Sequence, residues 1–219
     1  MQCNLGSGVN RGKELVHQYR QKILHGFFID LVPVSGEYAK DIVMLRNTNR
    51  VRYNMNQQSE LTVEDQLAWI STYFSRDNDL YWCILDKNGE FLGTYRMYDI
   101  DFENKVAEVG STIIVESRAK ERPYMIESAL LTYQVMFGGI GIEKIVAHTR
   151  SDNVKVRSIN KHLGAVETGM TRIQGVDFIN TEVDRLHFAG EKLNNILMHW
   201  INRETKRSHT NKSYCLREH

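Results

Sequence analysis

The stretch from Ala107 to Gly164 constrains the fold of this chain more than any other part of it. It begins with AEVGSTIIV, an apolar and β-branched run up to Val115 that predicts a buried strand. A charged turn follows. Residues Met125–Phe137 then carry apolar side chains at a period of about 3.6 residues, which predicts an amphipathic helix. After a glycine-rich turn, Lys144–Thr149 predicts a second strand. A strand, helix and strand in this order form a right-handed crossover, so we expect the two strands to be parallel.

The turn before the predicted helix holds Arg118, Lys120 and Arg122. The first N–H groups of a helix have no partner within the helix, and the helix dipole favours negative charge there. Basic side chains beside such a terminus suit a phosphate or pyrophosphate group. The sequence therefore predicts an anion-binding site at this turn.

The order and spacing of these motifs resemble the GNAT acetyltransferase superfamily, over about Phe27–Phe188. The features that carry the resemblance are the strand AEVGSTIIV, the basic turn, the helix segment IESALL, the strand KIVAHT, and Asn153 followed by KHLG up to Gly164. Within the superfamily the chain resembles nucleotide-linked amino-sugar N-acetyltransferases, and next the ribosomal-protein N-terminal acetyltransferases. One departure is clear: Lys120–Pro123 stands where the family usually has Gln-Gly-Lys-Gly, so both glycines are missing.

The resemblance implies an α/β fold with a mixed, mostly antiparallel central sheet, one parallel strand–helix–strand crossover and flanking helices. It implies transfer of an acetyl group from acetyl-CoA, without a metal, to the amine of a nucleotide-linked amino deoxy sugar, as in the biosynthesis of cell-surface polysaccharides. Two alternatives stay open. One is acetylation of a protein N-terminus, and the other, motivated by the missing glycines, is a non-catalytic CoA-binding or scaffold protein.

The resemblance also implies where the cofactor lies. The end of the first strand would contact the pantetheine and the turn would hold the pyrophosphate. The residues expected at the cofactor are Ile113, Ile114, Val115, Lys120, Glu121, Arg122, Pro123, Tyr124, Met125, Ile126, Asn153, Val156, Ser158 and Asn160. Asn153 would bond the cofactor or cap the following helix. The tyrosine with which many relatives protonate the leaving thiolate matches Asn160, so Ser158, water or another residue does this, or no acid is needed.

Two residues are candidates for the base that removes a proton from the acceptor ammonium. Glu108 lies on the strand that the thioester must lie against, and we favour it because nearby Gly110 allows close approach. His148 lies near the end of the second strand, and an unperturbed histidine titrates near neutral pH.

A cluster of hydrogen-bond donors follows an apolar helix pattern and is expected to face the acceptor, although a solvated surface remains the alternative. It consists of Arg46, Asn47, Arg50, Arg52 and Tyr53. Its arginines favour an anionic nucleotide diphosphate over a basic peptide.

We expect one domain at 27–202, with an N-terminal extension at 1–26 and a polar tail at 203–219. Within this domain the patterns predict further elements: strands at 27–34, 79–85, 90–97, 166–173 and 183–188, and helices at 37–55, 59–74 and 191–202. A short helix over 13–24 is expected in the extension.

Composition and net charge restrict the classes of partner that this protein can have. A formal net charge of +1 argues against a general nucleic-acid binder. No apolar run approaches the roughly 20 residues needed to span a bilayer. Three widely separated cysteines without metal-ligand spacing are typical of reduced thiols. We therefore expect a cytoplasmic enzyme with no membrane or nucleic-acid partner, and leave open whether it forms a homodimer.

Overall fold

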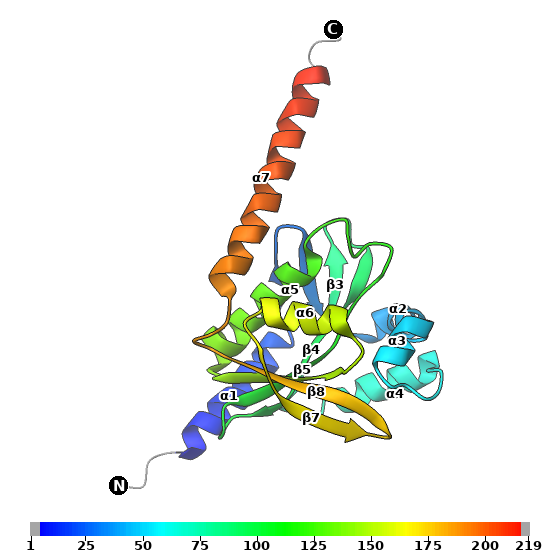
Figure 1. The fold of residues 1–219 in the computed structure, drawn as a ribbon, viewed down its shortest axis with the longest axis vertical. Helices are drawn as coiled ribbons and strands as arrows, with labels where there is room; N and C mark the ends of the chain where they lie inside the picture. The colour runs from blue at the N-terminus through cyan, green and yellow to red at the C-terminus, as the bar shows by residue number, and fades with distance from the viewer. Residues whose placement is uncertain (1–4, 216–219) are drawn as a thin grey trace.

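A mixed eight-stranded sheet forms the centre of the molecule, in the order β1-β2-β3-β4-β5-β6-β8-β7 (Figure 1). Neighbouring strands are antiparallel except β5 and β6, which are parallel. The computed structural model describes residues 5–215. Its strands are β1 (Leu24–His25), β2 (Ile29–Pro33), β3 (Leu80–Asp86), β4 (Phe91–Asp101), β5 (Val106–Ile114), β6 (Lys144–Arg150), β7 (Val166–Ile173) and β8 (Val176–Asp184). The predicted fold class, with its single parallel pair, is confirmed.

Helices cover both faces of the sheet (Figure 1). One face carries α1 (Leu5–Tyr19), α5 (Tyr124–Tyr133), the π-helix η2 (Gln134–Ile140), α6 (Val154–His162) and α7 (Gly190–Cys215). The other carries a short 3₁₀ turn, η1 (Gly36–Tyr38), with α2 (Ala39–Arg46), α3 (Asn49–Asn54) and α4 (Val63–Tyr73). Between Leu5 and Cys215, no helix combines the length and apolar character needed to cross a membrane.

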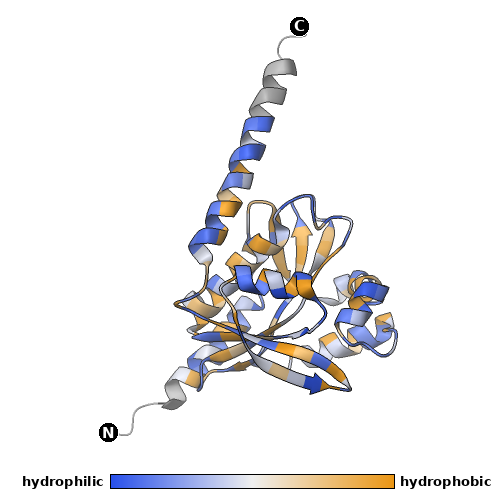
Figure 2. Ribbon diagram, viewed as in Figure 1, coloured by the Kyte–Doolittle hydropathy of each residue, from blue (hydrophilic) through white to orange (hydrophobic). Residues whose placement is uncertain are grey.

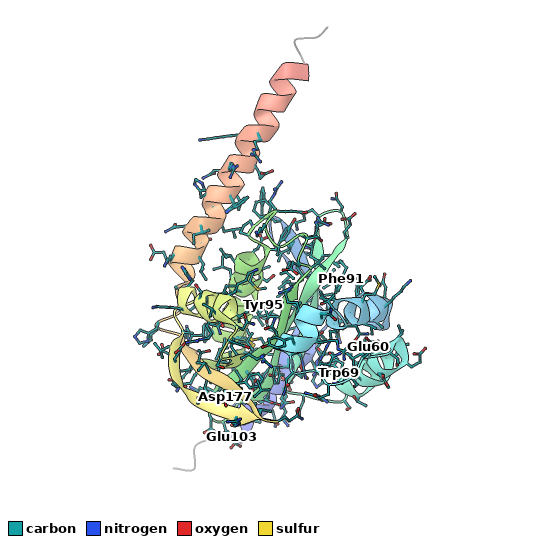
Figure 3. The ribbon with its side chains drawn as sticks, turned by 45° about the vertical axis from the view of Figure 1, so that its right-hand side comes forward. Glu60, Trp69, Phe91, Tyr95, Glu103 and Asp177 are labelled. Carbon is teal, nitrogen blue, oxygen red and sulfur yellow. The ribbon has the colours of Figure 1, made fainter. Side chains whose placement is uncertain are left out.

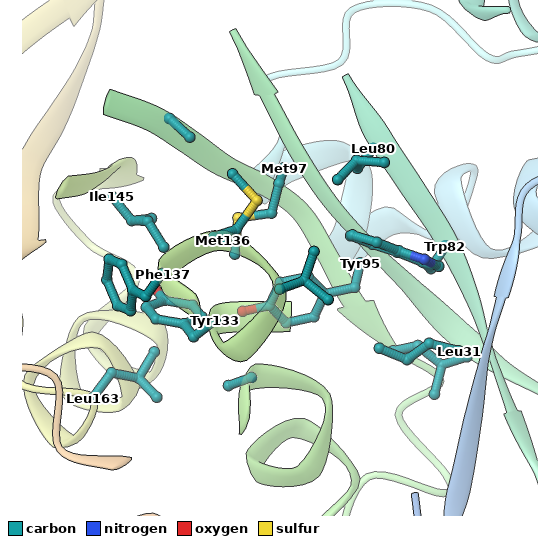
Figure 4. Packing of buried hydrophobic residues seen from close by; sticks show 14 of the residues in the cluster. Leu31, Leu80, Trp82, Tyr95, Met97, Tyr133, Met136, Phe137, Ile145 and Leu163 are labelled. Atoms are coloured by element: carbon teal, nitrogen blue, oxygen red, sulfur yellow. The ribbon is translucent and has the colours of Figure 1, made fainter. Parts of the chain in front are cut away.

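The larger core lies between the sheet and α5 with η2. Figure 4 shows Tyr133 and Met136 packed toward Tyr95 and Trp82, and all four side chains are at most 2% exposed. Burying a large apolar side chain of this kind contributes about 1.5–3 kcal/mol to stability. This packing fixes the crossover helix, and hence its N-terminus, against the sheet.

The parallel pair β5–β6 is short. Only three positions are in register: Val106 with Lys144, Ala107 with Ile145, and Glu108 with Val146. Ser111 has a φ of +47°, and the β4–β5 register shifts at this point, which marks a bulge in β5. Because a bulge bends its strand, β5 departs from the direction of β6 beyond Glu108.

The expected single helix over 37–55 is wrong, because the chain breaks it into η1, α2 and α3. The break lies at Asn47 and Thr48. The Asn47 amide bonds both the N–H and the C=O of Leu61, and Thr48 has an extended backbone. A side chain that bonds distant backbone competes with the helix at its own position.

The end of the sheet also differs from expectation. The predicted strand at 183–188 is wrong, because β8 spans Val176–Asp184 and meets β7 through a two-residue turn. Gln174 and Gly175 in this turn both have positive φ, of +49° and +79°. Two consecutive residues with positive φ form a hairpin turn whose twist matches that of the flanking strands. The strand β8 therefore begins directly after the turn, at Val176.

Two helices are longer than expected or displaced. The helix predicted to end at 202 continues to Cys215, and Figure 2 shows its outer part as largely hydrophilic. Good helix formers such as Glu204 and Lys206 sustain a helix without an apolar stripe. The N-terminal helix spans Leu5–Tyr19 rather than 13–24.

Candidate functional site

The ends of β5 and β6 separate into two edges. Among residues 5–215, β5 beyond Glu108 pairs only with β4, and β6 beyond Val146 pairs only with β8. Each strand therefore presents backbone donors and acceptors to the space between them. An extended ligand with amide groups can bond such an edge in the manner of an added strand.

Glu108 lies at the last paired position of β5, and its side chain is 20% exposed. Tyr98 on β4, opposite in register, donates a hydrogen bond from its hydroxyl to Glu108 Oε1. Burial and the neighbouring carboxylate raise the pKa of Tyr98, so the hydroxyl keeps its proton and remains a donor. A Cβ at Gly110 would lie 2.9 Å from the Tyr98 ring. The space that we expected Gly110 to leave for a ligand is thus occupied by Tyr98.

His148 lies on β6, with Nδ1 2.9 Å from Asn180 Oδ1 on β8. The Asn180 amide nitrogen donates to Thr171 Oγ1 on β7 at 2.9 Å. Because that nitrogen faces Thr171, the amide oxygen faces the imidazole and accepts from Nδ1–H. The neutral ring then has Nε2 free to accept a proton or a hydrogen bond.

Glu108 and His148 form one group rather than two alternatives. Glu108 Oε2 lies 3.8 Å from His148 Nε2. Since Oε1 is engaged by Tyr98 and Nδ1 by Asn180, the two remaining atoms are both acceptors and adjoin the same space. An ammonium carries several N–H donors and can bond both, and either acceptor can then take its proton.

A polar pocket of 260 Å³ opens between α3 and the end of β6. It is lined by Asn49, Arg52, Tyr53, Asn56, Gln57, Gln58 and Arg150. The Arg150 guanidinium lies 3.8 Å from the centre of the Tyr53 ring, and the Tyr53 hydroxyl donates to Asp152. Arg150 is two residues beyond His148, on the same face of β6 and about 7 Å away. The pocket therefore lies along the same face of β6 as His148, although neither Glu108 nor His148 lines it.

Of the residues predicted to bind the acceptor substrate, Arg52 and Tyr53 line this pocket. Arg46 and Asn47 support it from behind, because both bond Gln57, which is a lining residue. Burial lowers the pKa of Arg46.

Arg50 fastens α3 to the end of β5. Its guanidinium lies 3.2 Å from Glu116 and donates to the Ile114 carbonyl at 3.3 Å. The structure thus gives Arg50 partners at the edge of β5 rather than in the pocket.

The apolar end of β5 is built into the core. Ile113 and Ile114 are only 6% and 7% exposed, and Val115 packs beside Leu45 and Val51. Their side chains belong to the core, so what this segment offers to a ligand is its backbone.

The arginines of the basic turn have partners within the protein. Arg118 pairs with Asp86 at 3.0 Å, Glu90 at 2.7 Å and Glu121 at 2.6 Å, and these hydrogen bonds raise its pKa. Arg122 pairs with Glu204 of α7 at 3.0 Å. Lys120 is exposed and has no bonded partner among the described side chains. The turn is therefore less positive than its sequence suggests.

The N-terminus of α5 has free donors. Pro123 precedes it and supplies no side-chain cap. Within residues 5–215, the backbone N–H groups of Tyr124, Met125 and Ile126 have no acceptor. Such a terminus, with Lys120 nearby in sequence, is suited to an anion.

The residues expected on α6 are placed at its start and along its length. Asn153 caps the helix, because its side chain accepts from the Val156 N–H at 3.2 Å. Ser158 is exposed, and Asn160 donates to the hydroxyls of Thr149 and Thr181. These contacts place α6 against β6 and β8.

Several site residues were not predicted: Tyr98, Arg150, Asp152, Thr171 and Asn180. Tyr98, Thr171 and Asn180 reach the site only through the strand register, which leaves no local signal in the sequence. The short run RSDN, which ends at the predicted helix cap Asn153, was the one available indication of Arg150 and Asp152.

The family and the fold of this chain are shared with known proteins. A family model described as an acetyltransferase (GNAT) domain matches residues 29–166. By sequence, no curated protein matches the chain. Among solved structures, FdhC, a nucleotide-linked sugar GNAT in its apo form, is 25% identical, with a TM-score of 0.66, and the match covers 80% of this chain and 96% of that one.

Two further structures show the same fold at lower identity. A GCN5-related N-acetyltransferase from Brucella melitensis is 19% identical, with a TM-score of 0.67 over 82% of this chain and 85% of that one. A spermidine N-acetyltransferase from Vibrio cholerae, solved with CoA and spermine, is 14% identical, with a TM-score of 0.67 over 73% and 96%. The family match covers more than half of the chain. The chain therefore belongs to the GNAT acetyltransferases, which are acyl-CoA-dependent N-acetyltransferases.

Proposed function

We propose that this enzyme transfers an acetyl group from acetyl-CoA to the amine of a nucleotide-linked amino sugar. The observation that carries the proposal is the pair of acceptors Glu108 Oε2 and His148 Nε2, 3.8 Å apart, beside a polar pocket. Acetyl-CoA, when bound, supplies an acyl group activated as a thioester.

Glu108 and His148 act together on the amine of the acceptor substrate. Glu108 and His148 hold the ammonium by accepting its N–H donors, and one of them removes a proton. The free amine nitrogen would then bond to the acyl carbon of acetyl-CoA and lose its second proton, while the carbon–sulfur bond breaks and the leaving CoA thiolate takes up a proton. Tyr98 and Asn180 keep the two acceptors oriented throughout.

The cofactor is expected along the unpaired edge of β5, with its pyrophosphate at the start of α5. The free N–H groups of Tyr124, Met125 and Ile126, with Lys120, would hold the anion. The absence of the family's two glycines does not remove these N–H donors, because the donors belong to the first turn of α5 and not to the turn before it.

The lining of the pocket supports the sugar acceptor. It combines amide side chains, which suit hydroxyl groups, with Tyr53 as an aromatic wall and two arginines. None of the lining residues is acidic, although Glu60 and Asp152 pair with Arg52 and Arg150 from outside. Because both arginines already have these ion-pair partners, the case for a sugar rests on the amide side chains and the Tyr53 ring, and a lining without acidic residues is less suited to a polyamine or a basic peptide. The likeness to a nucleotide-linked sugar GNAT points the same way.

The acceptor is tested by measuring acetyl transfer to a panel of nucleotide-linked amino sugars, N-terminal peptides of ribosomal proteins, and spermidine. We expect turnover with at least one sugar and none with the peptides or spermidine. Turnover of peptides alone would establish the N-terminal acetyltransferase alternative. Absence of any thermal stabilisation by acetyl-CoA would instead support a non-catalytic scaffold, and stabilisation without turnover of any acceptor would support a non-catalytic CoA-binding protein.

A further inference from the structure

A second pocket, larger than the polar one, lies between the crossover helix and α7. Its volume is 510 Å³, within the range of small-molecule sites. It is lined by residues of α5, η2, α7 and the segment that joins β8 to α7, and by no residue of a strand. Tyr95, labelled in Figure 3, belongs to the core that fills the space between the sheet and α5. The pocket is therefore separate from the Glu108–His148 site, and none of the residues expected at the cofactor or the acceptor lines it.

The walls of this pocket are aromatic and aliphatic. Phe188, in the segment after β8, stacks on Tyr133 with ring centres 4.6 Å apart and lies 5.7 Å from the Phe137 ring. Leu131 and Leu197 add aliphatic surface from α5 and α7. An apolar molecule that covers such walls is removed from water together with them, which favours binding. The walls therefore suit a ligand with an apolar body.

Polar groups that the protein does not use also line the pocket. Tyr133 is only 2% exposed, yet its hydroxyl has no hydrogen-bond partner among the described residues. Burial raises the pKa of Tyr133, so this hydroxyl keeps its proton and can donate. Arg185 is exposed at the pocket, and its guanidinium pairs with no described side chain. Unused donors of this kind suit a ligand that carries acceptor oxygens.

The two ends of the pocket differ in charge. Near the start of α5, the Glu127 carboxylate is 2% exposed and accepts from the backbone N–H groups of Phe27 and Phe28. Arg185 lies at the other end, beyond η2, because its backbone N–H bonds the Glu143 carbonyl. A second carboxylate is disfavoured beside Glu127, since like charges repel, whereas the free guanidinium of Arg185 matches a carboxylate with two parallel hydrogen bonds.

We propose that this pocket binds an elongated apolar carboxylate, such as a medium-chain fatty acid, with its chain along α5 and its carboxylate at Arg185. The chain covers the aromatic rings of Tyr133 and Phe188, and the head group points away from Glu127. This site is additional to the one that transfers the acetyl group. The proposal does not depend on the identity of the acceptor.

The probe is decanoate, used below the concentration at which it forms micelles and titrated into the full chain by calorimetry. We expect one decanoate per chain, with an affinity that falls at least tenfold in Arg185→Gln. The matched control is Arg172→Gln on β7, which does not line the pocket and should stay within twofold of the parent chain. Decanol, which lacks the charge, should bind at least tenfold more weakly than decanoate.

A second variant tests the position of the chain without opening a cavity in the core. A Cβ at Gly138 would have no atom within 4 Å, so Gly138→Leu adds its side chain to the wall of the pocket. It should abolish decanoate binding without lowering the midpoint of thermal unfolding, because leucine is a better helix former than glycine. Absence of binding to the parent chain, equal binding by Arg185→Gln, or unchanged binding by Gly138→Leu would overturn the proposal. Since no acetyl-CoA or acceptor is present, these outcomes are independent of the proposed acetyl transfer.

Discussion

The two ends of the candidate site use their polar groups in opposite ways. At the Glu108 end, internal hydrogen bonds from Tyr98 and to Asn180 leave only acceptors, Glu108 Oε2 and His148 Nε2. At the turn before α5, internal ion pairs engage Arg118 and Glu121, and several donors are left without a partner among the described residues. These are Lys120 and the first N–H groups of the helix.

This difference indicates which substrate group belongs at each end. Leftover acceptors suit an ammonium, and leftover donors suit a phosphate. The residues that matter are those whose bonding capacity the protein itself has not used. A count of charged residues in the sequence does not identify them.

The largest effect is expected at the acceptor end. Glu108→Gln keeps the shape of the side chain but removes its capacity to take a proton, so turnover should fall roughly 10²-fold. Acetyl-CoA affinity should stay nearly constant. Steady-state kinetics and calorimetry measure the two quantities.

His148→Asn is the matched control for this experiment. If the two acceptors act as one unit, the double variant should be little slower than the slower single variant. Normal turnover in Glu108→Gln, with a strong loss in His148→Asn, would assign the proton transfer to the histidine alone.

A smaller effect, about tenfold in kcat/KM, is expected from Asn180→Leu, which removes the acceptor for His148 Nδ1–H. Asn180→Asp should keep more activity. Because an added carboxylate favours the protonated imidazole, the acidic limb of its rate profile should move to higher pH. Unchanged pH profiles in both variants would show that Asn180 does not orient the base.

The smallest effect is expected at the turn. Lys120→Glu should weaken acetyl-CoA binding roughly fivefold, the scale of an exposed charge contact. Arg122→Glu should change this affinity less, because Arg122 already pairs with Glu204. Calorimetric titration compares the two variants.

Lys120→Glu and Arg122→Glu should also differ in the midpoint temperature of thermal unfolding. Arg122→Glu places two like charges where Arg122 and Glu204 now pair, so its midpoint should fall while that of Lys120→Glu stays. A larger loss of cofactor affinity in Arg122→Glu than in Lys120→Glu would reverse this view of the turn.

Local patterns predicted the crossover well because the apolar run or periodicity of each element lies within consecutive residues. The strand up to Val115, the helix near Met125–Phe137 and the strand Lys144–Thr149 all correspond to observed elements. The strand predicted at 183–188 failed for a physical reason. β8 mixes buried positions such as Phe178 and Thr181 with polar ones, so its pattern was weaker than that of the apolar residues beyond it.

The candidate site was harder to predict, since its geometry depends on register. The sequence identified Glu108 and His148 but presented them as rivals, whereas the parallel pairing of β5 and β6 makes them neighbours. Similarly, nothing near Arg122 indicates Glu204, which lies 82 residues away in sequence. Long-range pairing of this kind leaves no trace in the local sequence.

The segment before β2 has a consequence for how this enzyme can be divided. The segment that matches the acetyltransferase family begins at residue 29. Two residues before that segment are nevertheless part of the packed structure, because Val16 is fully buried and Arg20 donates to the Asp79 carbonyl. Truncation to the matching segment would open a cavity and leave a buried carbonyl unpaired, both of which destabilise the remainder. The part of the chain that evolution has kept recognisable is therefore smaller than the part that must fold together.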